Sequence, residues 1–241
     1  MTPIRYKFFL ILFLVLLALF GVLASPLFHV RAVTVSGNVT RSEAEVLRLS
    51  GLDEPVNIFA VSSRGVSRAL KQDAYIGEVT VRRHFISRTI DLTIRERTLR
   101  GYVEFSPGMY LYIDEHGTVL EVASYFTEPL PVVVGLDVQP FTVGQLLDVT
   151  NQQSFNALIT LSHLFYQHGL SSSVVRLSLQ DRENTRIYIN NLSVDIGDMN
   201  DAAVKIQRLA HILPELEARG VTGGFLDLTD TSQPARFRAL T

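Results

Sequence analysis

The feature that most constrains this chain is an uncharged apolar run of 17 residues, Phe8 to Ala24. Arg5 and Lys7 precede the run, and the first acidic residue is Glu43. A helix rises about 1.5 Å per residue, so the run would extend about 25 Å, the short end of what a bilayer requires. Basic residues before a span favour a cytoplasmic N-terminus. We therefore expect a cytoplasmic tail (1–7), a transmembrane helix (8–24) and an extracytoplasmic remainder.

A cleaved secretory signal is the alternative interpretation of the same run. Such signals combine an apolar region of about 7–15 residues with a small-residue cleavage site, and Val22-Leu23-Ala24 could serve as that site. However, the run is longer than a usual signal core, and Leu27 and Phe28 extend its apolar character. The length therefore favours an uncleaved anchor.

Composition and motifs exclude several classes of function. The 22 basic and 24 acidic residues give a net charge of −2, without the dense basic surface that nucleic-acid binding requires. No cysteine is present, which removes thiol catalysis and cysteine-ligated metals. Motifs for phosphate loops, serine nucleophiles and zinc-binding helices are also missing. We expect no cofactor, no metal, no nucleic acid and no small-molecule substrate.

The pattern over residues 28–97 predicts a small domain in the order strand, helix, helix, strand, strand. A capping box of Thr40 and Glu43 predicts a first helix over 41–49. Alternating apolar residues predict the strands. The other expected elements are a helix over 64–71 and strands over 30–36, 76–84 and 89–96.

From residue 98 to 241 the sequence predicts short strands separated by turns, together with two amphipathic helices over 154–168 and 201–219. The whole chain therefore predicts an α+β fold, in which a β-α-α-β-β domain precedes a mixed β-sheet domain with two helices. The expected strands of the second domain cover residues 99–105, 110–114, 119–122, 132–134, 174–179, 185–189, 192–196, 225–228 and 236–240.

The best catalytic candidate in the sequence is Asp114-Glu115-His116. A membrane-anchored or secreted hydrolase could use these groups, but they fall in a predicted hairpin turn, where such polar residues are ordinary. His163 and His168 lie five residues apart on a predicted helix, about 140° around its axis, so they would not converge on one metal. We therefore expect no enzymatic activity.

Several short motifs follow the apolar run in order. They are V-T-V-S-G-N at 33–38, N-I-F at 57–59, V-T-V-R-R at 79–83, I-D-L-T-I-R-E-R at 90–97, Y-I-D-E-H-G-T-V-L at 112–120, L-P-V-V-V-G-L at 130–136, V-D-I-G at 194–197, K-I-Q-R-L-A-H-I-L-P-E-L at 205–216 and F-L-D-L at 225–228. In order and spacing they resemble the FtsQ/DivIB family of bacterial cell-division proteins over nearly the whole chain. Departures from the family pattern are Phe85-Ile86 and Thr98, where proline is common, and Thr229 and Asp230, where a basic and an aromatic residue are usual.

This resemblance implies a POTRA domain over residues 28–97 and a larger FtsQ-type β domain over 98–241. It also implies a non-enzymatic scaffold with one membrane span, located in the bacterial cytoplasmic (inner) membrane at the division septum. Family members bind FtsB/DivIC-like and FtsL-like single-span proteins and help regulate septal peptidoglycan synthesis. A different function for a POTRA domain, as a chaperone of a secretion system, is the other alternative.

The resemblance also implies a partner site at the C-terminal strands, where a partner strand would add to the edge strand at 234–240 beside residues 225–230. Phe237 is the expected apolar anchor, although it could instead only cover the sheet. Arg182 stands where the family has an arginine that pairs with an acidic partner residue. The complete expected partner-binding set is Arg182, Phe225, Leu226, Arg236, Phe237 and Arg238.

Overall fold

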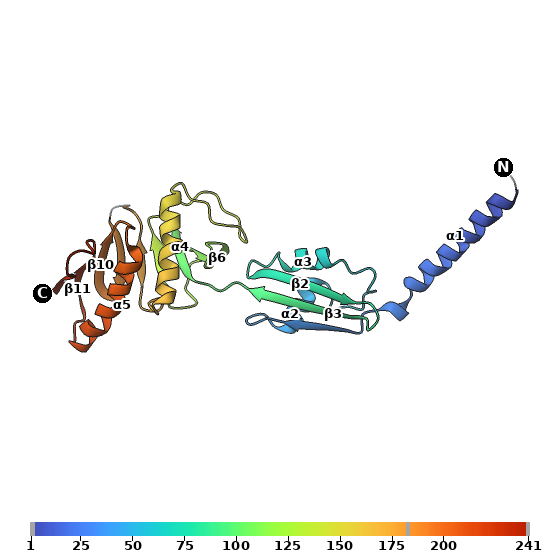
Figure 1. Ribbon diagram of the computed structural model, residues 1–241, viewed down its shortest axis with the longest axis horizontal. Helices are drawn as coiled ribbons and strands as arrows, with labels where there is room; N and C mark the ends of the chain where they lie inside the picture. Colours follow the sequence, from blue (N-terminus) through green and yellow to red (C-terminus); the bar gives the residue numbers. More distant parts are fainter. Residues whose placement is uncertain (1–2, 182–183, 240–241) are drawn as a thin grey trace. The chain divides into compact units, whose positions relative to one another are not determined.

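The computed structural model describes residues 3–181 and 184–239 and has an α+β fold (Figure 1). Two compact units divide the chain, the first ending at Arg97 and the second beginning at Thr98. The described residues contain five α-helices, one short 3-10 helix and two separate sheets. These elements follow the order predicted from the sequence, and most predicted strand boundaries hold to within two residues.

The chain begins with helix α1 (Pro3–Leu23), which is followed by the 3-10 turn η1 (Pro26–Phe28). The large apolar side chains of α1 from Phe8 to Val22 are exposed. By length and hydropathy, no helix among the described residues qualifies as a membrane span.

The first unit contains a three-stranded sheet in the order β1-β3-β2. β1 runs parallel to β3, and β2 runs antiparallel to β3. Val46 of α2 and Val66 and Leu70 of α3 pack with the sheet residues Ile90 and Leu92 to form the core. The elements are β1 (Ala32–Ser36), α2 (Glu43–Ser50), α3 (Ser63–Leu70), β2 (Ile76–His84) and β3 (Thr89–Glu96).

The predicted capping box is wrong. Helix α2 begins at Glu43, and Ser42 caps it by accepting a hydrogen bond from the amide of Glu45 at 3.3 Å. Thr40 does not cap the helix, because its hydroxyl hydrogen-bonds to the carboxylate of Glu96, to which its amide also donates at 2.8 Å. That contact holds the loop before α2 against the end of β3, and the helix begins at Glu43, two residues later than predicted.

Glu96 fixes this loop through three backbone hydrogen bonds. Its carboxylate accepts from the amides of Val39 (3.0 Å), Thr40 (2.8 Å) and Arg41 (3.0 Å). Burial acts to raise the pKa of Glu96, but hydrogen bonds from Arg41, Thr40 and Val39 outweigh burial and lower the pKa below its ordinary value. The ionised carboxylate is therefore the form that stabilises the loop.

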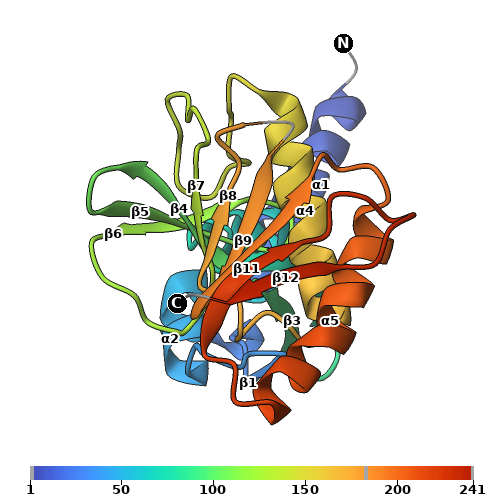
Figure 2. The ribbon, with the colours of Figure 1, turned by 90° about the vertical axis from the view of Figure 1, so that its left-hand side faces the viewer.

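The second unit contains a nine-stranded sheet in the order β12-β11-β10-β9-β8-β7-β4-β5-β6. Helices α4 (Gln152–Gln167) and α5 (Ala202–Ala218) lie beside each other against one face of it (Figure 2). Parallel pairs occur at β4-β7, β7-β8 and β10-β11. The strands are β4 (Gly101–Ser106), β5 (Met109–Ile113), β6 (Val119–Ala123), β7 (Val132–Val134), β8 (Arg176–Ser178), β9 (Thr185–Ile189), β10 (Asn191–Gly197), β11 (Gly223–Asp227) and β12 (Arg236–Ala239).

The opposite face of this sheet is covered at the β4-β5 end by an aromatic cluster. Tyr102 and Tyr112 are buried with ring centroids 4.7 Å apart, and Phe126 packs on Tyr102 at 4.7 Å. The Tyr102 hydroxyl donates to the carbonyl of Glu128 at 2.9 Å, which fixes the loop after β6 over the sheet. The loop therefore shields the β4-β5 end of this face.

We predict that Glu96→Gln destabilises the 39–41 loop by about 1 kcal/mol near neutral pH, because an amide replaces the charged acceptor. The folded pKa of Glu96 is depressed, so its contribution is present above about pH 4.5 and is lost as the pH falls through the folded pKa. Amide hydrogen exchange of residues 39–41 measures the effect. The variant and the wild type should differ above pH 4.5 and converge in acid, and equal exchange near pH 7 would contradict the assignment.

Candidate partner-binding edge

Strand β12 forms one edge of the nine-stranded sheet, with β11 as its single strand neighbour among the described residues (Figure 2). The two strands are antiparallel, with Phe225 opposite Arg238 and Leu226 opposite Phe237. An edge strand carries backbone N–H and C=O groups directed away from its neighbour, and these groups can pair with an added strand. β12 therefore has the geometry that strand addition requires.

The expected binding residues separate onto the two faces of the sheet. Phe225, Arg236 and Arg238 lie on the face away from the helices, and Phe225 is 53% exposed. Leu226 is only 2% exposed and its side chain belongs to the core, so it supports the strand from within. The alternation of a strand explains this division, because neighbouring residues point to opposite faces.

Phe237 lies on the core-facing side, opposite Leu226. A Cβ added at Gly224 would come within 2.6 Å of the Phe237 ring and 2.5 Å of the Arg238 carbonyl oxygen. The ring thus packs directly over the glycine, although Phe237 keeps 38% of its surface exposed. This packing is compatible with the alternative in which Phe237 only covers the sheet, and the contact with Gly224 would also hold β12 against β11.

A groove of about 610 Å³ runs along the outward face at this edge. Arg186 of β9 and Asp195 of β10, which the sequence analysis missed, form an ion pair at 3.5 Å and contribute to its lining. The sequence could have indicated them, because both residues occupy outward-facing positions in the alternation of strands that were predicted. The groove is lined by Arg186, Ser193, Asp195, Phe225, Leu226, Asp227, Thr229, Arg236, Phe237 and Arg238.

The charge of this edge depends on Asp227, which is held by hydrogen bonds and lies opposite an arginine. Thr229 donates to the carboxylate of Asp227 from its hydroxyl (2.7 Å) and its amide (3.0 Å). These hydrogen bonds, assisted by the charge of Arg236, lower the pKa of Asp227. Asp227 is therefore ionised at neutral pH and faces Arg236 across the strands.

The connection between β11 and β12 is ordered by short side-chain turns. Asp230 accepts from the hydroxyl (2.6 Å) and amide (2.8 Å) of Ser232. Arg208 of α5 donates to the carbonyl of Gln233 at 3.2 Å and to that of Thr231. Thr229 and Asp230, which break the family pattern, thus have a structural role here in returning the chain to the edge.

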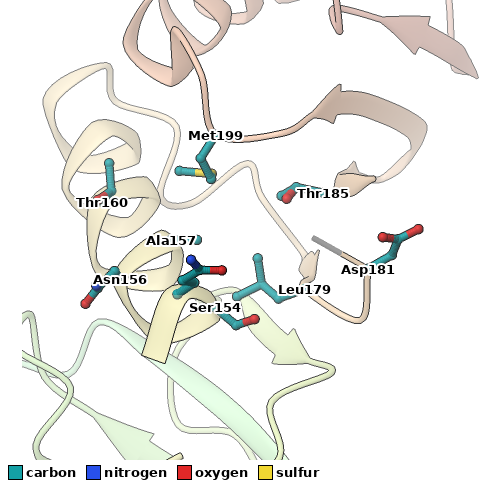
Figure 3. A pocket seen from close by; sticks show the side chains of 9 residues that line it. Ser154, Asn156, Ala157, Thr160, Leu179, Asp181, Thr185 and Met199 are labelled. Atoms are coloured by element: carbon teal, nitrogen blue, oxygen red, sulfur yellow. The ribbon is translucent and has the colours of Figure 1, made fainter. Parts of the chain in front are cut away.

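Arg182 lies outside the described residues. The preceding residue, Asp181, lines a pocket of about 360 Å³. This pocket lies between the first turns of α4 and the segments around Leu179 and Met199 (Figure 3). The described residues that line it are mainly neutral, with Asp181 as the single charged side chain among them. Those described residues do not combine an acid, a base and a nucleophile.

The alternative catalytic residues do not form a cleft. The Asp114 carboxylate accepts from the amides of His116 (2.9 Å) and Thr118 (2.7 Å), which is the arrangement of a polar turn. Glu115 and His116 are exposed, with His116 Nε2 3.6 Å from the Glu115 carboxylate. The described residues also contain no cluster of three potential metal ligands.

Comparison with known proteins identifies both units. A family model described as POTRA domain, FtsQ-type, matches residues 28–97, and one described as cell division protein FtsQ/DivIB, C-terminal, matches residues 101–229. The second match covers more than half of the chain. The chain belongs to the FtsQ/DivIB family. The match to the FtsQ/DivIB C-terminal model ends before β12 begins.

Individual relatives agree with this family. The cell division protein DivIB of Clostridium tetani is 23% identical over 88% of this chain and 80% of its own length. The cell division proteins FtsQ of Myxococcus fulvus and Syntrophotalea carbinolica are 28% and 29% identical over 88% of this chain, covering 73% and 74% of their own lengths. The family expected from the motifs is thereby confirmed.

We predict that Gly224→Val releases β12 from the sheet of this FtsQ/DivIB chain, because the added side chain would collide with the Phe237 ring and the Arg238 carbonyl. Amide exchange over residues 236–239 should accelerate about tenfold or more, as expected for a loss above about 1.4 kcal/mol. Phe225→Val, a change on the outward face of the same strand, is the matched control. Unchanged exchange in Gly224→Val would show that Phe237 does not hold the strand.

Proposed function

We propose that this chain is a non-enzymatic scaffold of the bacterial division machinery that binds partner proteins through the β12 edge. The single observation that carries the proposal is the edge strand β12. Phe237 holds it on the helix-facing side of the sheet, and no other strand of the described residues pairs with its free edge. The partners are FtsB/DivIC-like and FtsL-like single-span proteins, as the family resemblance implies. Their recruitment would help regulate septal peptidoglycan synthesis.

Strand addition explains how the edge can bind without a deep pocket. Backbone hydrogen bonds supply affinity, and alternating side chains supply selectivity. On the outward face, the exposed ring of Phe225 and the guanidinium groups of Arg236 and Arg238 would lie beside the added strand. We expect these arginines to favour a partner segment with acidic residues. Arg182 remains in the proposed site through the family resemblance alone.

We also propose that residues 8–24 attach the chain to the cytoplasmic membrane as a single span, with residues 1–7 in the cytoplasm and the two units outside. What supports this attachment is the uncharged run in the sequence and the exposure of its apolar side chains. The basic residues before the run support the orientation. Location at the septum follows from the cell-division family.

We predict that a chain ending at Thr231, which lacks β12, fails to capture a small single-span partner from cross-linked membranes, whereas the intact chain captures it. Arg238→Glu should weaken binding of the same partner about tenfold, because it places a like charge opposite an acidic segment. Mass spectrometry of the cross-linked material identifies the partner, and titration measures its affinity.

Arg219→Glu is the matched control, because Arg219 is an exposed arginine at the end of α5 and away from the groove. Circular dichroism establishes that each variant is folded. Equal capture by the intact and shortened chains would move the binding surface away from β12. Failure of both chains to capture any such partner would contradict the scaffold function itself.

A further inference from the structure

Three segments far apart in the sequence meet at one end of the first unit. The amide of Ile58 donates to the carbonyl of Phe28 at 2.9 Å, and the amide of Arg31 donates to the carbonyl of Arg88 at 2.8 Å. The register explains the meeting, because β1 starts with Ala32 beside Thr89, the first residue after the β2-β3 turn. The segment after η1, the 57–59 turn and the β2-β3 turn therefore form one surface.

This surface, formed by Leu27, Phe28, Phe59, Phe85 and Ile86, carries an exposed apolar patch. Phe59 contacts Phe28 with ring centroids 5.2 Å apart and stacks on Phe85 at 5.5 Å with an interplanar angle of 17°. Leu27 is 69% exposed, Phe59 46%, Phe85 44% and Ile86 fully exposed. Contiguous aromatic exposure of this kind marks a binding surface, whereas a single exposed apolar residue would not.

Arginines flank two of the three segments of the patch in the sequence. Residues 27–31 and 82–88 contain four arginines and no acidic residue. Arg83 lies over the Phe85 ring at 5.1 Å, and its guanidinium donates to the carbonyl of Val61, so the cation and the ring are held together. The nearby acid Asp91 is engaged by His84 at 2.8 Å. Aromatic rings beside arginines suit the interface between hydrocarbon and anionic headgroups.

The patch is also continuous with the apolar N-terminal helix. Leu27 and Phe28 follow the last residue of α1, Leu23, by only four and five positions, a distance of about 18 Å even when fully extended. The side-chain amide of Asn57, next to the patch, donates to the carbonyl of Leu23 at 2.8 Å. If α1 enters a membrane, the patch must therefore lie close to the surface of that membrane.

We propose that this patch binds the anionic lipid surface of the membrane that α1 enters, with Phe59, Phe85 and Ile86 reaching the headgroup boundary and the arginines contacting lipid phosphates. The inference rests on the membrane attachment proposed above. It assigns the β2-β3 turn a role as a second lipid contact, which restricts the orientation of the first unit at the membrane.

The absence of tryptophan from the chain allows a direct test. Ile86→Trp creates a unique fluorophore at the patch. Val39→Trp is the matched control, because Val39 is 88% exposed and follows the other end of β1. The full-length variants are placed in nanodiscs of phosphatidylglycerol and phosphatidylcholine, with or without bromine on the acyl chains. Co-elution of protein with nanodiscs tests the membrane attachment separately from the patch.

We expect brominated lipid to quench about half of the fluorescence of Ile86→Trp, with a blue-shifted emission, because interfacial side chains sit about 5–10 Å into the headgroup boundary. Val39→Trp should be unaffected. Co-elution with equal, weak quenching of both variants would overturn the lipid contact while leaving the attachment intact. Failure to co-elute would overturn both. Equal quenching in nanodiscs of phosphatidylcholine alone would overturn the role assigned to anionic lipid.

Discussion

The second unit depends on one constraint, which is that every open sheet ends in strands with unpaired backbone groups. In the described part of this unit, nine strands share one sheet, and helices α4 and α5 both pack against a single face of it. Neither helix is available to cover the β12 edge. An uncovered edge is a hazard because it can pair with any extended segment, so a stable edge must be short or shielded by charge. Within the described residues β12 spans four positions, Arg236–Ala239, and carries two arginines, which is consistent with both conditions.

The same constraint explains how the edge is kept in register. A short strand has few ladder hydrogen bonds, so its position must be fixed by other contacts. Phe237 over Gly224 fixes the strand on its inner side, and Arg208 fixes the chain that leads to it. A rigid edge lowers the ordering cost of binding, since only the partner strand has to become ordered. In the proposed binding mode, the inner contacts would therefore act through preorganisation.

Sequence patterns predicted the elements well because periodicity reports which face of an element is buried. Strands β2, β3, β7 and β9 appear at the predicted residues, and the order of all elements holds. The start of α2 was predicted two residues too early. Glu96, more than 50 positions away in the sequence, binds Thr40, which was expected to cap the helix. Phe237 was equally hard to place. Its face depends on the register with Leu226, and no local pattern specifies that register.

The proposed binding through a backbone edge is also compatible with the divergence within the family. Relatives between 23% and 29% identical to this chain are still recognised over most of its length. A pocket that reads side chains would tolerate little of that change, whereas strand addition needs only an open edge and a compatible pattern of charge. Thr229 and Asp230 illustrate the point, because they replace the usual residue types yet form turns that lead the chain back to β12. Selection on such a site would preserve the position of the edge more strictly than the residues around it. Gly224 is a position where the residue itself matters to the edge, because the close approach of Phe237 leaves no room there for a side chain.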